Sequence, residues 1–154
     1  MRRLGIRSLK WSALALALAL ALSCFGVGLA AAQSLEDRRI QASREAELGK
    51  AAELTDRACG TQLKAGFDWS SFDSAQIASQ NVVSWCTAAL AAMEDICSDA
   101  LGKKALSAKV KTLTCGGAAT PSVTLDGEGT VKFFFSLTPN QNKLLVRDYL
   151  NKNL

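Results

Sequence analysis

Apolar side chains recur most regularly between residues 82 and 97, at steps of three and four positions. This spacing predicts a helix that buries one face. Asp73 or Asn81 can cap its N-terminus, and we expect the helix to run to about Ala100, with Gly102 just beyond it as a stop signal. The residues on the predicted buried face are Val82, Trp85, Cys86, Ala89, Met93, Ile96 and Cys97.

A second helix is predicted from Ser34 to Cys59, where Gly60 follows as a stop signal. Ser34 can act as the N-cap, with Asp37 three residues later in a variant of the capping box. Charged residues fill the first half of this helix, so we expect that half to be solvated and only the second half to pack. The predicted packed face consists of Leu48, Ala51, Ala52, Thr55, Ala58 and Cys59.

The hydrophobic period changes to two after Gly102, in short runs rich in Val, Thr, Leu and Phe that cover residues 109–115, 122–127 and 130–137. The sequences GGAATP and DGEG between them are turn signals, so we predict a three-stranded antiparallel meander. Phe134 would point away from its buried face. That face is expected to contain Leu113, Cys115, Val123, Leu125, Val131, Phe133, Phe135 and Leu137.

A last helix is predicted to begin with Thr138 as N-cap and Pro139 as first helical residue. Its apolar stripe needs a surface to pack on, and the open face of the hairpin offers one. We therefore interpret this helix as an element that closes the fold. The stripe consists of Leu145, Val146, Tyr149, Leu150 and Leu154.

The longest predicted connection, residues 60–79, carries Phe67, Trp69 and Phe72 among Gly, Ser and Asp residues. Aromatic side chains in a polar loop are frequent interface anchors, so this segment is a possible binding loop. Alternatively, the rings fold back as a lid over the core. We favour the lid, because phenylalanine and tryptophan bury large apolar areas that a monomer rarely leaves exposed.

The N-terminal segment combines four basic residues with a long apolar run that ends in three alanines. This pattern is typical of a secretory signal peptide that is cut after the last alanine, Ala32. We therefore predict a signal peptide over residues 1–32 and a single mature α+β domain over residues 33–154, which is periplasmic or secreted.

Two alternatives to a cleaved signal peptide remain. The run from Trp11 to Ala32 is long enough for an uncleaved membrane anchor. A lipoprotein signal would instead be cut before Cys24, although the large Leu22 stands where such signals usually carry a small residue. We favour cleavage after Ala32, because a highly polar segment follows it.

Four cysteines remain in the mature chain, and an even number in an exported protein predicts two disulfides. Cys86 and Cys97 cannot pair within a continuous helix, because eleven residues of helix separate them by roughly 16 Å. Two pairings remain: Cys59–Cys86 with Cys97–Cys115, or Cys59–Cys97 with Cys86–Cys115. We expect the first, because an antiparallel helix pair would place the end of the first helix beside the early part of the second.

The mature chain is formally neutral, since four of the 18 Lys and Arg residues precede position 33 and the other 14 match the 14 Asp and Glu residues. A neutral chain argues against nucleic acid or an anionic membrane as a partner, so we expect membrane contact only through an uncleaved signal or a lipid anchor.

The inventory of chemical groups is poor in catalytic residues. The sequence contains no histidine and no phosphate-loop, dinucleotide or calcium motif, so we expect no enzyme activity, no cofactor and no metal. Glu94, Asp95 and Asp99 could suggest a cation site. We interpret them as solvated helix charges, with an ion pair between Asp99 and Lys103.

Five motifs follow one another between residues 59 and 154: CG with a DWSSF loop, a helix with two cysteines, a strand that ends in TLTC, a hairpin around DG, and a terminal VRDYLNKNL helix. In this layout the chain resembles a group of small exported bacterial proteins of unknown function. The resemblance implies a periplasmic or secreted α+β domain and no particular reaction.

The predicted fold class is thus α+β, with a two-helix core braced by two disulfides, a three-stranded antiparallel meander and a C-terminal helix. We expect a non-enzymatic module that binds an unknown protein or small ligand of the cell envelope. The alternative is a small histidine-free hydrolase or an inhibitor-like active domain, which predicts a polar cleft with converging ionisable groups.

Overall fold

The computed structural model describes residues 25–136 and 142–154. Contacts within the chain divide it into two units, Met1–Arg38 and Arg39–Leu154. Of the first unit, the structure describes the start of helix α2 (Phe25–Cys59). Most of the predicted signal peptide, including Cys24, lies outside the described residues, as do Leu137 and the predicted start of the last helix.

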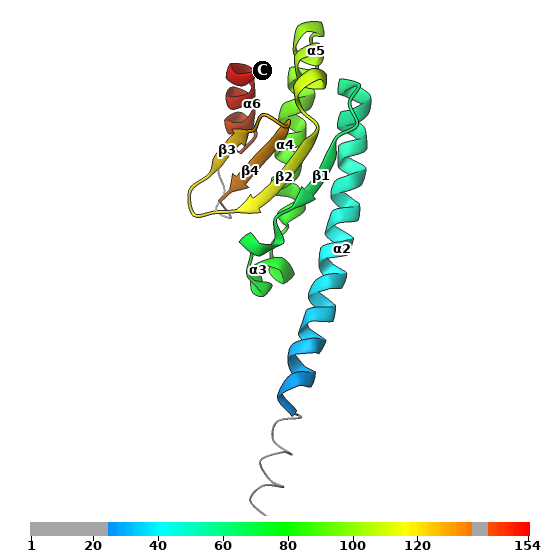
Figure 1. Ribbon diagram of the computed structural model, residues 1–154, viewed down its shortest axis with the longest axis vertical. Coiled ribbons are helices and arrows are strands. Elements are labelled where there is room, and N and C mark those ends of the chain that lie inside the picture. Colours follow the sequence, from blue (N-terminus) through cyan, green and yellow to red (C-terminus); the bar gives the residue numbers. More distant parts are fainter. Residues whose placement is uncertain (1–24, 137–141) are drawn as a thin grey trace, which may run out of the picture. The chain divides into compact units, whose positions relative to one another are not determined.

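A four-stranded mixed sheet forms the centre of the second unit (Figure 1). Its strands are β1 (Lys64–Phe67), β2 (Thr112–Gly117), β3 (Ser122–Leu125) and β4 (Thr130–Phe135), and their order across the sheet is β1-β2-β4-β3. β2 pairs in parallel with both β1 and β4, whereas β3 pairs antiparallel with β4. The α+β class is confirmed, and the predicted three-stranded antiparallel meander is wrong.

The hairpin around DGEG is the part of the predicted meander that forms. The carboxylate of Asp126 accepts hydrogen bonds from the backbone N–H groups of Glu128 (3.0 Å) and Thr130 (2.9 Å), which closes the turn between β3 and β4. Gly129 completes it with a φ of 89°, in the region that favours glycine. β2 cannot extend the hairpin, because it occupies the other edge of β4 in the parallel direction.

The described residues contain five helices beside the sheet: α2, α3 (Ser74–Ser79), α4 (Val82–Ile96), α5 (Ala100–Lys109) and α6 (Asn142–Asn153). A 3₁₀ turn, η1 (Trp69–Ser71), precedes α3. Helix α2 ends at Cys59 as predicted but begins upstream of Ser34, which therefore lies inside the helix.

Both candidate N-caps of the cysteine-bearing helix are used, by different helices. Asp73 caps α3 in a full capping box, and Asn81 caps α4 by accepting a hydrogen bond from the backbone N–H of Ser84.

Helix α5 was not predicted, because Gly102 suggested a helix end. The glycine is needed for a different reason: a Cβ at this position would lie 2.2 Å from the carbonyl oxygen of Ile96. It therefore permits the close approach of α5 to the end of α4.

The apolar face of the sheet is packed against α4, which passes behind the strands in Figure 1. The predicted inward-facing residues that the structure describes do share one face. Val131 lies beside Leu125 across the hairpin, and the parallel pairing with β2 places Leu113 on its other side. The predicted face of α4 is buried as expected, except that Trp85 is only partly buried. The buried residues of the sheet's inner face are Phe67, Leu113, Cys115, Val123, Val131, Phe133 and Phe135.

The preferred disulfide pairing is wrong: the bonds are Cys59–Cys97 and Cys86–Cys115. Strand β1 is the reason. In chain order β1 follows α2 and precedes α4, and it runs in the direction opposite to α2. The two helices therefore run in the same direction, and their C-terminal ends meet (Figure 1). These bonds are the alternative pairing that the sequence left open, and they confirm that Cys86 and Cys97 do not bond to each other.

Side-chain contacts support the parallel arrangement of α2 and α4. Thr55 is fully buried on α2, and its hydroxyl donates a 2.8 Å hydrogen bond to the carboxylate of Glu94 on α4. Leu48 and Ala52 are buried on the same face as predicted, whereas Ala58 is exposed. On α6, Val146 and Leu150 are buried, while Leu145 is 38% exposed.

The two disulfides indicate an oxidising compartment outside the cytoplasm. Within residues 25–136 and 142–154, no helix has an apolar stretch long enough to cross a membrane.

Candidate functional site

Two adjoining hollows open at the end of the sheet where β1, β2 and β4 begin. The turn hollow, of about 410 Å³, lies between the Asp126–Gly129 turn and the ends of α5 and α6. The strand hollow, of about 450 Å³, lies over the first residues of the three parallel strands. Lys111 and Glu128 line both hollows and stand at their shared rim.

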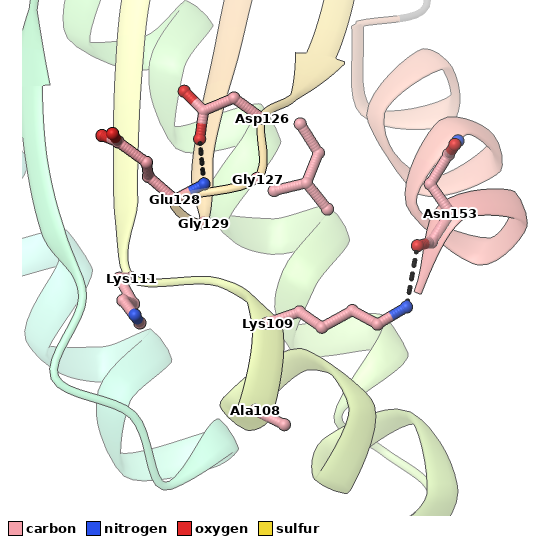
Figure 2. Close-up of a pocket in the computed structure, with 9 residues that line it drawn as sticks. Ala108, Lys109, Lys111, Asp126, Gly127, Glu128, Gly129 and Asn153 are labelled. Carbon is pink, nitrogen blue, oxygen red and sulfur yellow. Dashed lines mark hydrogen bonds between the residues drawn. The ribbon is translucent and has the colours of Figure 1, made fainter.

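Two of the four charged side chains that line the turn hollow, Lys109 and Asp126, are occupied by contacts within the fold (Figure 2). The ammonium of Lys109 donates to the main-chain oxygens of Asn153 (3.1 Å) and Leu154, at the end of α6 where a cation is favoured. Asp126 holds the turn. The hydrogen bond from the backbone N–H of Thr130 is the main cause that lowers the pKa of this carboxyl, with further lowering by the N–H of Glu128.

The strand hollow contains a row of polar side chains that crosses three strands. Lys64 on β1 is the register partner of Thr112 on β2, and Thr112 is the register partner of Thr130 on β4. Because neighbouring strands lie about 4.8 Å apart, the row spans roughly 10 Å. Alternation along the strands places these residues on the face opposite the buried Leu113 and Val131.

Most polar groups of this hollow take no part in holding the fold. Among the described residues, no hydrogen-bond or ion-pair partner is found for the side chains of Gln62, Lys64, Lys111, Thr112, Glu128 and Thr130. By contrast, the neighbouring Thr61 hydroxyl donates to the carboxylate of Asp56 at 2.7 Å. Thr112 and Thr130 are half-buried, so their hydroxyls face the hollow rather than bulk solvent on all sides.

The opposite charges at the shared rim do not neutralise each other. Figure 2 shows the side chain of Lys111 directed away from the carboxylate of Glu128. The strand hollow is therefore lined by two ammonium groups, those of Lys64 and Lys111, and by one carboxylate at its edge.

The predicted aromatic segment lies elsewhere, at the opposite end of β1. Phe67 and Phe72 are buried, with 9% and 7% exposure, and the Phe72 ring lies 5.9 Å from that of Phe135 in the core. Trp69 packs at 4.7 Å on Phe67 and donates its indole N–H to Glu45 on α2. This packing is the arrangement that the lid interpretation describes; a binding role of the three rings stays a prediction.

The three carboxylates near the end of α4 have different partners. Glu94 accepts from Thr55, Asp95 forms a 2.7 Å ion pair with Lys143 of α6, and Asp99 caps α5 by accepting from the N–H groups of Leu101 and Gly102. They therefore serve the packing of α2, α5 and α6. No group of His, Cys, Asp or Glu residues that could hold a metal ion occurs in the described part of the chain.

Sequence reasoning did not find the strand hollow. Its lining comes from the connection between α2 and β1, from β1, α5, β2, the β3–β4 turn and β4, which meet through the parallel pairing of the strands. The alternation in TLTC and TVKF did indicate that Thr112 and Thr130 face away from the core. The chain matches no family model, no curated protein and no solved structure, so the resemblance to small exported proteins stays a prediction.

Proposed function

We propose that the protein is an exported, non-enzymatic binding module, periplasmic or secreted, whose strand hollow takes a polar ligand. One observation carries the proposal: a hollow of about 450 Å³ in which the row Lys64, Thr112 and Thr130 presents polar groups that no described residue satisfies. Ligand sites are typically concave and use a few convergent polar groups for specificity.

The proposed export rests on the N-terminal pattern together with the disulfides. Cleavage after Ala32 would remove residues 25–32 from helix α2 and leave the mature chain to begin at Gln33. We expect the intact mass of the exported protein to match residues 33–154 with two disulfides and no lipid. A species that begins at Cys24 with added acyl mass would show a lipoprotein instead.

Ligand binding at the strand hollow can be tested by NMR with isotope-labelled exported protein and a panel of small polar compounds. The backbone amides of Gln62, Thr112 and Thr130 should shift and saturate with some members of the panel. Shifts confined to the aromatic segment around Trp69 would transfer the site to the predicted binding loop. Absence of saturable shifts at the hollow would overturn the proposal.

A polar cleft with ionisable groups is also what the alternative function, a histidine-free hydrolase, would use. Such chemistry needs a nucleophilic hydroxyl within hydrogen-bond reach of a base. Lys64 and Thr112 are register partners, yet no hydrogen bond joins their side chains in the described structure. An ester-hydrolysis assay separates the two functions: turnover that is lost in Thr112→Val and retained in Thr114→Val would favour the hydrolase.

A further inference from the structure

The strand hollow carries an unbalanced positive charge. Its lining contains two lysines, Lys64 and Lys111, against the single carboxylate of Glu128. Neither ammonium has an ion-pair partner among the described residues, and the Lys111 side chain points away from Glu128 (Figure 2).

The carboxylates nearest to the hollow keep their charge, but their oxygens accept hydrogen bonds from neutral donors of the fold and form no ion pair with either lysine. The carboxylate of Asp56, next to the hollow, accepts from the Thr61 hydroxyl and from the backbone N–H of Leu63, both at 2.7 Å. Asp126 is held by the N–H groups of its own turn. An anion that enters the hollow therefore meets two ammonium groups with no described carboxylate paired to either of them.

Hydroxyl and amide groups lie beside the two lysines. Thr112 stands next to Lys64 in the cross-strand row, Thr130 follows on the far side of Thr112, and Gln62 lines the hollow just before β1. Hydroxyls and amides can both donate and accept hydrogen bonds, so they suit the hydroxyl groups of a ligand, whereas ammonium groups donate only.

We propose that the ligand of the strand hollow bears an anionic group, a carboxylate or a phosphate, which Lys64 and Lys111 hold. Hydroxyl groups of the same ligand contact Thr112 and Thr130. This inference rests on the proposed function. Charge-assisted hydrogen bonds of this kind are stronger than those between neutral groups. A sugar acid or a sugar phosphate combines both features.

Three probes that share one sugar ring test this inference: glucose, glucuronate and glucose 6-phosphate, titrated into the labelled exported protein at constant ionic strength. We expect the amides of Thr112 and Thr130 to saturate with at least one of the two anions. Glucose should bind roughly tenfold more weakly or not at all, since it lacks the charged contact. The stronger of the two anions identifies a carboxylate or a phosphate as the preferred group.

Variants locate the contact. Lys64→Ala with Lys111→Ala should weaken the anion roughly fivefold or more, because two exposed charge contacts are removed. Lys132→Ala is the matched control: this lysine is exposed on β4, two residues after Thr130, and lines neither hollow. The affinity of the Lys132→Ala variant for the anion should stay at the wild-type value. Both variants should have the melting temperature of the wild type.

Each other result has a defined meaning. Equal affinity for glucose and both anions, or no loss in the double lysine variant, would overturn the anionic group while leaving a polar ligand in the hollow. If the amides of Thr112 and Thr130 show no saturable shift with any of the three probes, the anionic inference is overturned. If they show none with the wider panel of polar compounds either, the proposed function is overturned as well.

Discussion

The two faces of the sheet are built from the same strands and serve different purposes. Along β2, Thr112 is half-buried on the outer face while the adjacent Leu113 is fully buried on the inner face. Along β4, Thr130 and Val131 differ in the same way. Since successive side chains point to opposite faces, one residue step separates the core from the candidate site.

This difference indicates where stability and binding reside. The inner face buries large apolar side chains against α4 and carries Cys115, whose disulfide fixes β2 to that helix. The cross-strand row of the outer face has no described partner for its polar groups, so the fold gains little from it. Substitutions on the two faces should therefore have separable effects.

Adjacent phenylalanines on β4 provide the largest expected contrast. Phe133 is fully buried on the inner face, and Phe134 is half-buried on the outer face, where its ring lies over Gly116. We expect Phe133→Ala to lower the free energy of unfolding by about 4 kcal/mol, as for other buried aromatic truncations. Phe134→Ala should cost about 1 kcal/mol. Urea denaturation measures both, and equal losses would contradict the division between the faces.

Removal of the disulfide between α4 and β2 should have the next largest effect. The Cys86–Cys115 bond closes a sequence separation of 29 residues. Loss of such a cross-link by the double change to alanine should reduce stability by roughly 3 kcal/mol, mainly because the unfolded chain gains freedom.

The pairing itself can be checked by peptide mapping of the non-reduced protein. Cleavage after Glu94 separates Cys86 from Cys97, and we expect one linked pair with Cys59 and Cys97 and another with Cys86 and Cys115. A Cys59–Cys86 peptide would contradict the parallel arrangement of α2 and α4.

Alternation and helical periodicity predicted the inner face of the sheet, the buried face of α4 and the end of α2. They did not predict the pairing of the strands, because alternation assigns residues to a face of the sheet but does not determine the order or direction of the strands. β1 was missed since KAGF lacks β-branched residues and pairs on one side only. The disulfide pairing then failed with it, because an unrecognised strand reverses the chain between the two helices.

The candidate site was beyond sequence reasoning for the same cause. Lys64 and Thr112 are 48 positions apart in the chain, and only the parallel register of β1 and β2 makes them neighbours. Their residue types are ordinary for solvent-exposed strand positions. The pattern could therefore assign Thr112 to the outer face but could not bring a lysine beside it.

The smallest expected effect concerns pH. Hydrogen bonds from the N–H groups of Thr130 and Glu128 lower the pKa of Asp126, so its ionised form stabilises the folded state. This contribution is complete above the unfolded pKa of about 3.9 and is lost as pH falls through the lower folded pKa. Asp126→Asn should therefore show a slightly shallower loss of stability than the wild type between about pH 5 and about pH 2, measured by urea midpoints. An identical pH dependence would argue against this role.

The central claim, that the outer row serves binding and not folding, is tested most directly in the triple variant Lys64→Ala, Thr112→Val, Thr130→Val. Its unfolding in urea and its NMR response to the sugar probes are measured on the same protein. We predict an unfolding free energy within about 0.5 kcal/mol of the wild type, as for other surface changes, together with loss of the saturable probe response. A loss of several kcal/mol, or a probe response with the wild-type midpoint, would contradict the claim.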